Sequence, residues 1–367
     1  MQGWQSLPFE ACIEQVVYSA KVQRKDFLAE GAYPIVSQEE AFINGFWDQE
    51  ADIFRVDRPL VVFGDHTRIL KYIDFDFVLG ADGVKVLKPK SFLHPRFFYY
   101  QLHTAKVDSL GYARHYRLLK EHRVAYPTYA EQQRIVVILD EAFEGIATAK
   151  ANAQKNLRHL RDIVSNYLEA LFDEEASGWV AKKLGQVCDF QGGSQPPKSQ
   201  FVYGPKLGYI RFLQIRDFSS DKNMTYIPES NKNRMCSEDD ILIGRYGASV
   251  GKILTGKSGA YNVALVKAIP DIVVLNKEFF RKYLVSSVFQ KQLMNVAARS
   301  AQNGFSKEDI SEFLVPLPSL KEQQEIVDSI KPLVEQTLRL ERVYSRKMAA
   351  LEDLKKSLLH QAFTGQL

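Results

Sequence analysis

Pro127-Thr128-Tyr129-Ala130-Glu131-Gln132-Gln133-Arg134-Ile135-Val136 is the stretch of sequence that decides the fold. It recurs 191 residues later as Pro318-Ser319-Leu320-Lys321-Glu322-Gln323-Gln324-Glu325-Ile326-Val327. The same offset relates Leu160 to Leu351, Leu168 to Leu359 and Phe172 to Phe363 without a gap. A long segment of one length has therefore been duplicated in this chain.

Both copies begin with the sequence signature of a helix start. Thr128 with Glu131, and Ser319 with Glu322, have the spacing of a capping box, in which the hydroxyl and the carboxylate each bind a backbone N–H at the helix start. A proline precedes each cap, where it does not interrupt helical hydrogen bonds. The sequence therefore predicts two long helices, over residues 128–175 and 319–367.

Apolar residues in both segments follow a heptad spacing, which is typical of a coiled coil. They are Leu157, Leu160, Val164, Tyr167 and Leu171 in the first, and Ile330, Leu333, Thr337, Leu340, Tyr344, Leu351, Leu354 and Leu358 in the second, where Lys347 interrupts the frame. Two such helices in one chain pair most simply with each other, and antiparallel pairing would place their preceding domains at opposite ends. The alternative is that each helix packs only on its own domain.

The remaining segments, residues 1–127 and 176–318, are predicted to be globular domains of mixed α/β structure. Pro59–Gly64 and Asp240–Gly244 are apolar runs with the length of buried strands, and each opens into a polar loop, 65–68 or 245–249. The predicted fold class is therefore α+β, with two mixed α/β domains joined by two long helices that pair as an antiparallel coiled coil.

Composition favours a reduced, non-membrane protein with one basic domain. Residues 176–318 carry 19 basic against 12 acidic side chains, whereas residues 1–127 carry 16 of each. A basic domain is suited to phosphate contact. The three cysteines are too few and too far apart for a disulfide framework or a zinc site, and no apolar run approaches the length of a signal peptide or membrane span.

One sequence pattern suggests catalysis. Gly251-Lys252-Ile253-Leu254-Thr255-Gly256-Lys257-Ser258 matches the phosphate-binding pattern GxxxxGK[ST], which works between a strand and a helix. The following residues, 260–266, are typical of a strand instead. The sequence contains none of the common hydrolase, zinc-protease or dinucleotide patterns, so we predict no catalytic residues and no metal site.

The combination of features resembles the specificity subunit of type I restriction-modification systems. The resemblance spans nearly the whole chain and rests on these segments: Glu131-Gln132-Gln133, Glu322-Gln323-Gln324, Leu359-His360-Gln361-Ala362-Phe363-Thr364-Gly365, Phe63-Gly64-Asp65-His66-Thr67-Arg68, Ala81-Asp82-Gly83 and Pro316-Leu317-Pro318. The first domain departs from the expected pattern because it is shorter than the second and has no net basic charge.

That resemblance implies two target-recognition domains, each reading one half of a split sequence in double-stranded DNA, with the helix pair fixing the unread gap. The implied partners are two adenine methyltransferase subunits, which hold S-adenosylmethionine, and restriction/translocase subunits, which use ATP and Mg; this chain itself would carry no cofactor and no catalysis. The implied location is the cytoplasm of a prokaryote, without membrane association.

Polar residues in loops at strand ends are the predicted DNA contacts, because Arg can grip guanine with two donors and the other side chains supply single contacts. Two other functions stay open: an enzyme that uses the loop 251–258, and a purely structural coiled-coil adaptor. The predicted contacts are His66, Arg68, Lys71, Arg114, His115 and Arg117 in the first domain, and Gln195, Lys198, Gln214, Arg216, Arg245, Tyr246 and Asn303 in the second.

Overall fold

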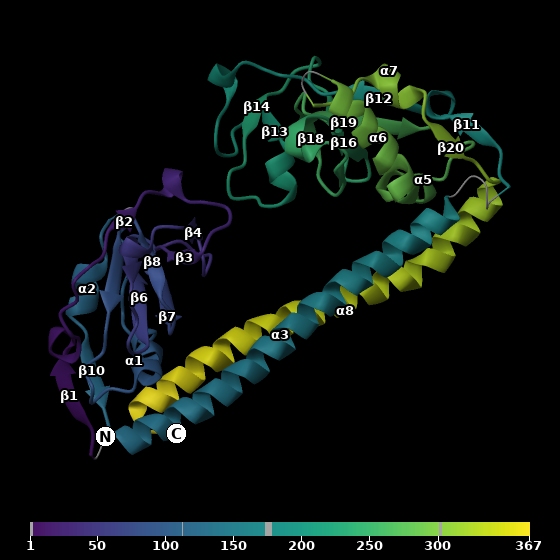
Figure 1. The fold of residues 1–367 in the computed structure, drawn as a ribbon. Coiled ribbons are helices and arrows are strands. Elements are labelled where there is room, and N and C mark those ends of the chain that lie inside the picture. The colour runs from purple at the N-terminus through teal and green to yellow at the C-terminus, as the bar shows by residue number, and fades with distance from the viewer. Residues whose placement is uncertain (1–2, 112, 173–177, 301–302) are drawn as a thin grey trace. The chain divides into compact units, whose positions relative to one another are not determined.

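The chain folds into two compact units, Met1–Gln154 with Ser345–Leu367 and Lys155–Tyr344. The structure, a computed structural model, describes residues 3–111, 113–172, 178–300 and 303–367. Each unit contains one globular domain together with parts of two long helices, α3 (Tyr129–Leu171) and α8 (Leu320–Thr364) (Figure 1). We call the globular parts, residues 3–127 and 178–318, domain 1 and domain 2. The predicted boundary at residues 175 and 176 lies outside the described residues.

The described residues of domain 1 form three sheets and two short α-helices. Its central strand, β6 (Leu60–Gly64), is buried along its whole length, as expected for an apolar run rich in β-branched residues. A core cluster that includes Val62 and Leu79 fills the space between the two larger sheets. The other elements are β1 (Gln5–Pro8), β2 (Lys21–Val22), β3 (Tyr33–Val36), β4 (Gly45–Trp47), β5 (Ile53–Phe54), β7 (Leu70–Ile73), β8 (Phe77–Gly80), β9 (Val84–Leu87), β10 (Arg123–Tyr126), α1 (Pro95–Leu102) and α2 (Tyr116–Lys120).

Domain 2 also contains three sheets, with three helices. Its buried central strand is β16 (Ile241–Gly244). Asn276 caps helix α5 (Lys277–Val285) by accepting hydrogen bonds from the backbone N–H groups of Glu278 and Phe279. The other elements are β11 (Ala181–Lys183), β12 (Cys188–Gly192), β13 (Tyr209–Leu213), β14 (Tyr226–Pro228), β15 (Met235–Cys236), β17 (Ile253–Leu254), β18 (Gly259–Tyr261), β19 (Leu265–Pro270), β20 (Leu314–Pro316), α6 (Ser287–Arg299) and α7 (Lys307–Ser311).

The strands of the two domains pair in the same order. In domain 1, β6 pairs antiparallel with β7 and β9, and β3 pairs parallel with β8 and antiparallel with β4. In domain 2, β16 pairs antiparallel with β17 and β19, and β13 pairs parallel with β18 and antiparallel with β14. The duplication therefore includes the globular domains, although their sequences have diverged. Helix α6 has no counterpart among the described elements of domain 1.

One edge distinguishes the two domains. In domain 2, β12 pairs with β19 along five residue pairs, so β19 is an inner strand of its sheet. In domain 1, β9 is the last strand of its sheet, and only the isolated bridge between Ile13 and Pro89 continues beyond it. The outer edge of β9 is therefore open in the sense that no strand pairs with Val84–Leu87, although the Tyr18 hydroxyl binds the N–H of Val86 there, whereas the edge of β19 is covered by β12.

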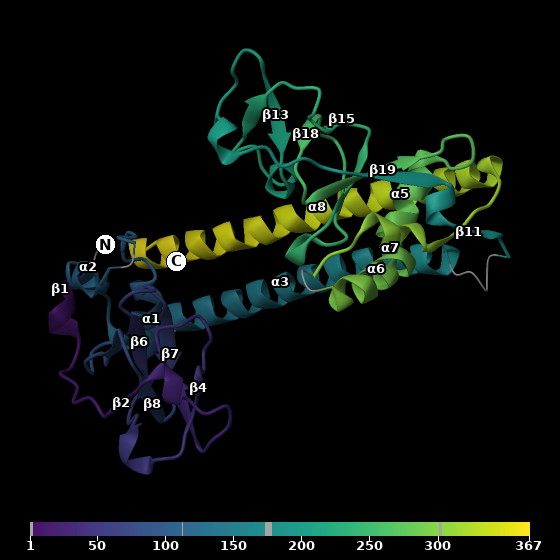
Figure 2. The same cartoon turned by 90° about the horizontal axis from the view of Figure 1, so that it is seen from above.

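The long helices pair antiparallel, as predicted, within each unit (Figure 2). In the first unit, Lys150 of α3 forms an ion pair with Glu352 of α8, and Arg134 donates to the backbone oxygen of Leu367. In the second, Arg161 pairs with Glu341 at 2.8 Å. As residue numbers rise along α3, those of its partners on α8 fall.

Each domain packs against the beginning of the helix that follows it and the end of the other helix. Phe363, near the end of α8, packs on Phe97 of domain 1 at a ring distance of 5.1 Å. Phe172, directly after α3, packs on Phe279 of domain 2 at 5.3 Å. Phe172 and Phe363 are the duplicated pair noted in the sequence, so one contact is made twice.

The heptad frame predicts the seam only in part. Ile330 and Thr337 are buried as predicted, but Leu354 is 48% exposed, and Leu359, Ala362 and Phe363 are buried near the end of α8 instead. In α3, Tyr167 is 42% exposed and Leu168 is buried instead. The frame fails after Lys347 because a charged side chain does not fit the seam, and burial there follows domain 1 rather than the heptad. Pro332 lies inside α8 without ending the helix.

The two helix starts are alike but not identical. Ser319 and Glu322 form the full reciprocal capping box, with bonds of 2.8 and 3.4 Å. At the other start only the hydroxyl of Thr128 binds, accepting from the N–H of Glu131 at 3.4 Å. The Glu131 carboxylate pairs with Arg134 instead of reaching back, so the predicted box is half formed there.

The duplicated middle glutamine has a structural role. Gln132 is fully buried; its amide donates to the backbone oxygens of Phe92 and Pro127, and its oxygen accepts from the N–H of His94. Gln323 makes the same three bonds in domain 2, to Val274, Pro318 and Asn276. The repeated glutamine therefore ties each domain to the start of its helix.

Within the described part of the chain, no helix has both the length and the apolar character needed to cross a membrane. The three cysteines, Cys12, Cys188 and Cys236, are free and buried. Burial raises the pKa of the Cys12 thiol to about 11, so it stays protonated at neutral pH.

Candidate nucleic-acid interface

The loop after β6 in domain 1 is built around Asp65, which is only 2% exposed. Its N–H donates to the backbone oxygen of Gly83 at 2.7 Å, and its carboxylate accepts from the N–H of Tyr116 at 2.7 Å. Its own backbone oxygen accepts from the N–H of His115 at 2.8 Å. Asp65 thus joins the strand end, the β8–β9 turn and the start of α2.

His66 and Arg68 lie on this anchored loop. The N–H of His66 donates to the side-chain oxygen of Gln38 at 3.1 Å, and its ring Nδ1 lies 3.2 Å from the backbone oxygen of Ala113. Arg68 has a left-handed backbone, with φ of 64°, and its guanidinium donates to the backbone oxygen of Val107. Such a conformation costs roughly 1–2 kcal/mol in a non-glycine residue. The surrounding hydrogen bonds hold the loop in this conformation.

Lys71 does not lie at the surface, contrary to its predicted role. It is 3% exposed, and its amino group donates to the backbone oxygens of Ala41 and Phe42 and to the side-chain oxygen of Asn44. Burial lowers the pKa of the Lys71 amino group to about 8. Lys71 sits on the inner face of β7 and holds the loop 41–44, so it positions that loop rather than contacting DNA in this conformation.

His115 is also buried, with 1% exposure, and its ring is fixed from both sides. Nδ1 donates to the backbone oxygen of Asp65 at 2.9 Å, while Nε2 accepts from the N–H of Leu110 at 3.0 Å. These two contacts fix the orientation of the ring. His115 therefore supports the loop after β6 from within. Arg114 and Arg117, on either side, are exposed at the surface.

Domain 2 brings three of the predicted residues together. The N–H of Arg245 donates to the backbone oxygen of Ala264 at 2.9 Å, and its Nε donates to that of Phe305 at 2.9 Å. The guanidinium lies over the Tyr246 ring, 5.0 Å from its centroid. Asn303, with φ of 47°, accepts from the N–H of Gly247 at 2.9 Å. Arg245, Tyr246 and Asn303 thus form one surface cluster at the end of β16.

Gln214 and Arg216 form a second group, at the end of β13. Both side chains donate to the hydroxyl of Thr225, at 3.5 and 3.3 Å. The backbone N–H of Gln214 donates to Asp217 at 2.7 Å. Among the described residues, no hydrogen bond or ring contact connects this group with Arg245, Tyr246 or Asn303.

Gln195 and Lys198 lie on the exposed loop between β12 and β13. Gln195 lines a surface pocket with residues of the loop that follows β14, including Ser230, Lys232 and Asn233. The walls of the pocket include Pro196, Pro197 and Pro228, so amide groups stand beside an apolar surface. This combination can contact the edge of a base and its apolar face.

The sequence pattern at residues 251–258 does not form a phosphate loop. Ile253 and Leu254 within it are strand β17, and β18 rather than a helix follows. The Lys257 amino group binds both carboxylate oxygens of Asp221 at 2.9 Å. A phosphate loop needs its lysine and a helix start directed at the phosphate, so this geometry does not support the enzyme hypothesis.

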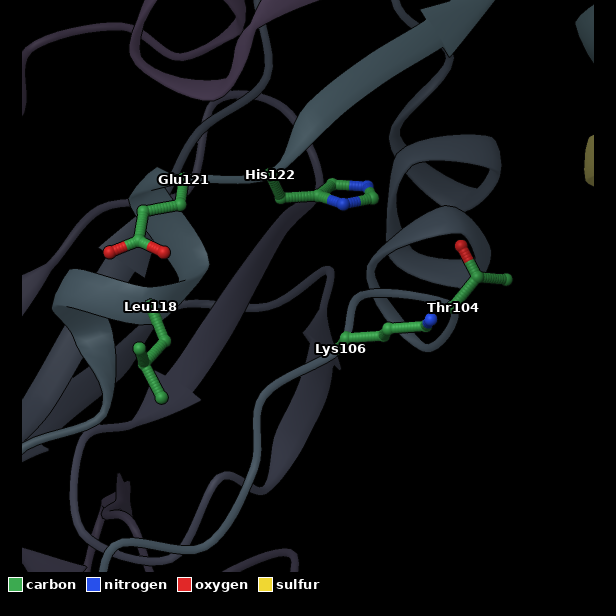
Figure 3. A pocket seen from close by; sticks show the side chains of 5 residues that line it. All are labelled: Thr104, Lys106, Leu118, Glu121 and His122. Carbon is green, nitrogen blue, oxygen red and sulfur yellow. The ribbon is translucent and has the colours of Figure 1, made fainter.

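A pocket at the surface of domain 1 is lined by Thr104, Lys106, Leu118, Glu121 and His122 (Figure 3). The His122 ring points toward the side of Thr104 and Lys106, whereas the Glu121 carboxylate points away from it. Burial lowers the pKa of His122, so its ring is neutral at neutral pH. The charged groups do not converge on one point, and within the described residues no cluster of side chains is suited to a metal ion.

Sequence reasoning missed the residues that hold these loops. Asp65 lies directly after a buried strand, and this position could have indicated an anchor. Gln38 binds His66 across 28 residues of sequence, and no local pattern indicates that pairing. DNA contact by the predicted surface residues stays a prediction.

The comparisons with known proteins agree on one family. A family model described as the type I restriction modification DNA specificity domain matches residues 176–347. The chain is 23% identical over 342 residues to the type I restriction enzyme EcoR124I/EcoR124II specificity subunit of Escherichia coli, covering 84% of this chain and 80% of that protein. It is 26% identical over 336 residues to the EcoKI specificity subunit of Escherichia coli (strain K12), covering 81% and 70%.

Solved structures have the same fold. One match is a chain from a solved structure whose subject is complex assembly and conformational transition of the type I R-M system. The TM-score is 0.76 at 18% identity, over 100% of this chain and 99% of that one. The HsdS subunit from Thermoanaerobacter tengcongensis matches with a TM-score of 0.51, also at 18% identity, over 100% and 98%.

Proposed function

Because the chain belongs to the family of type I restriction-modification specificity subunits, a family of non-catalytic DNA-recognition subunits, we propose that domain 1 and domain 2 each read one part of a two-part DNA target. In this proposal two methyltransferase subunits dock on the chain and supply S-adenosylmethionine. Restriction/translocase subunits, which use ATP and Mg, complete the assembly. This chain binds none of these cofactors itself.

The observation that carries the proposal is the loop at the end of the central strand, present at the same topological position in both domains. It presents His66 and Arg68 after β6, and Arg245 and Tyr246 after β16. Both loops are fixed by hydrogen bonds to the residue directly before the neighbouring strand of the sheet, Gly83 before β9 and Ala264 before β19. Anchored loops with different side chains are suited to reading different bases, since sequence is read by side-chain contacts with base edges.

Arg245 is the residue we expect to read a base in domain 2. Its Nε is committed to Phe305, and its guanidinium is supported by Tyr246, so its remaining donors are held in one orientation. An arginine held in this way can give two hydrogen bonds to a guanine, which discriminates against other bases by about 1–3 kcal/mol.

The test is to co-express the full chain with its methyltransferase subunits and map methylated adenines across a genome. The wild-type chain should yield a two-part sequence, and Arg245→Ala should relax one position in one part only. Arg281→Ala removes the same charge from α5, where Arg281 pairs with Glu278, and should leave the sequence unchanged. A one-part sequence, or methylation or cleavage by this chain alone, would refute the proposal; assembly that is indifferent to DNA would favour the adaptor.

A further inference from the structure

The open edge of β9 in domain 1 carries cations at a place where domain 2 is closed. Lys85 of β9 pairs with Phe63 of β6, and the corresponding residue in domain 2 is Val266, which pairs with Ile243. Val266 is buried under β12 through its pairing with Gly192. Lys85 has no such cover and is only half-buried.

Two tyrosines support the lysines along this edge. The hydroxyl of Tyr18 accepts a hydrogen bond from the N–H of Val86 at 3.1 Å, and the Lys21 amino group lies 4.8 Å from the centre of the Tyr18 ring. The Lys85 amino group lies 5.4 Å from the centre of the Tyr116 ring. Both amino groups are thus held over aromatic faces, where a cation is stabilised without a carboxylate.

Arg114 brings a third cation to this edge. Lys85 and Arg114 both lower the pKa of the Lys21 amino group, after burial, whereas Asp82 raises it. Like charges are therefore close to one another here. The carboxylate of Glu10 pairs with Lys120 at 2.6 Å rather than with these three cations. Across the described residues, no carboxylate lies within 4 Å of the charged groups of Lys21, Lys85 or Arg114.

The cations adjoin the candidate recognition loop. Arg114 follows Ala113, whose backbone oxygen contacts the His66 ring. Gly83, directly before β9, lies so close to His66 that a Cβ there would be 2.9 Å from its ring. The open edge and the loop after β6 therefore form one continuous face of domain 1.

We infer that Lys21, Lys85 and Arg114 form a binding site for DNA backbone phosphates along the open edge of β9, beside the loop that carries His66 and Arg68. This inference rests on the proposed function of domain 1 as a DNA reader. It accounts for how a domain without net basic charge holds a polyanion: its positive charge is gathered at one edge. Such contacts are independent of base sequence and position the reading loop.

Edge protection is the competing explanation, because lysines on edge strands also prevent pairing between sheets of different molecules. It accounts for Lys85, which is on β9. It also accounts for Lys21, because β2 is the outer strand of the other sheet, but it does not account for Arg114, which lies outside both sheets.

The experiment measures the affinity of the full chain, assembled with its methyltransferase subunits, for target and non-target duplexes over a range of salt concentrations. Replacing Lys21, Lys85 and Arg114 by glutamine should weaken both complexes by the same factor. It should also reduce the slope of log K against log salt concentration by about 2.7, since each phosphate contact contributes about 0.9. The ratio of target to non-target affinity should not change.

Lys90→Gln is the matched control, because it removes an exposed lysine just beyond the other end of β9, and the salt slope should not change. Lys85→Arg keeps the charge and should retain the wild-type slope, which separates loss of charge from loss of folding. An unchanged slope in the triple variant would overturn the inference, and self-association of that variant would in addition favour edge protection. Loss of the target preference in the wild-type chain would instead refute the proposed function.

Discussion

The loops after β6 and β16 occupy the same position in two domains of the same topology. The side chain that anchors the loop is a hydrogen-bond acceptor in domain 1 and a donor in domain 2. In domain 1 the first loop residue is Asp65, a buried acceptor for the N–H of Tyr116. In domain 2 it is Arg245, a donor to the backbone oxygen of Phe305. The partner is the first residue of the short helix α2 in domain 1, and it lies two residues before the short helix α7 in domain 2.

This difference shows which features of the domain are fixed and which can vary. The connection between the strand end and the segment before α2 or α7 is kept, but its donor and acceptor are exchanged. The side chains presented at the surface change with it, from His66 and Arg68 to Arg245 and Tyr246. A domain can thus present a different set of side chains without a change in strand pairing.

The largest expected effect comes from removing the aromatic contact that both domains share. Phe97→Ala in domain 1 and Phe279→Ala in domain 2 should each destabilise the chain by about 3–5 kcal/mol, because both rings are fully buried against a helix-end phenylalanine. Denaturant unfolding measures the loss, and hydrogen exchange locates it. Each variant should lose protection mainly in its own unit, whereas Leu354→Ala, at an exposed position, should change little. Equal loss in both units would contradict two separate cores.

The glutamine that ties each domain to its helix should have the next largest effect. Gln132→Met leaves two backbone oxygens and the N–H of His94 without partners, which should cost about 2–4 kcal/mol. Gln323→Met should cost less, because Asn276 has a second link to Gln324 at 2.9 Å. Gln133→Met, at an exposed position, is the control. Urea unfolding of the three variants would detect the order, and a Gln133 effect as large as that of Gln132 would contradict it.

Asp65 tests the polarity of the loop anchor. Asp65→Ala removes the acceptor for Tyr116 and should cost about 2 kcal/mol, typical of a hydrogen bond to a charged group. Asp65→Asn keeps an acceptor oxygen and should retain most of the stability. Thermal unfolding of wild type and both variants measures the loss of stability that each substitution causes. If Asn were as harmful as Ala, the carboxylate charge rather than the hydrogen bond would anchor the loop.

The smallest expected effect concerns Lys71, whose counterpart in domain 2 is Leu254: Val62 pairs with Lys71, and Leu242 pairs with Leu254. Burial lowers the Lys71 pKa to about 8 in the folded chain, below the value near 10.4 of an unfolded lysine. The unfolded chain therefore binds more protons between these pH values, and stability should rise with pH by about 1 kcal/mol from pH 8 to 9.

Lys71→Leu should remove this rise, because leucine does not titrate. The difference in unfolding free energy between wild type and variant, measured at pH 7, 8 and 9, isolates the lysine from other groups. It should be constant below pH 8 and change above it. A constant difference through pH 9 would show that the three acceptors around Lys71 keep it charged.

Much of the fold could be predicted from the duplicated helix start. The repeat and the capping residues placed the starts of α3 and α8 within one residue, and the heptad spacing predicted their antiparallel pairing. The prediction was wrong at Leu354, since packing against domain 1, not periodicity, decides burial near the end of α8. A heptad pattern describes the faces of a single helix. It contains no information about which helix residues a domain distant in sequence will bury.

The candidate site was less predictable because it depends on which face of a strand or turn each side chain occupies. Lys71 and His115 have the composition of surface contacts but point inward, where backbone oxygens bind them. Lys21 and Lys85 were not identified, because their role depends on an edge that domain 1 leaves open and domain 2 closes. That difference is visible only when the two sheets are compared strand by strand.

Phe172 and Phe363 have a consequence for the connectivity of the chain. Since each long helix begins on one domain and ends on the other, the order in which the two domains are encoded is interchangeable. A circular permutant that starts at domain 2 and continues from Leu367 into domain 1 through a short linker would keep every contact described for α3 and α8. Two domains related in this way can be recombined as whole halves, each with the helix that follows it, without a change in the contacts between the halves.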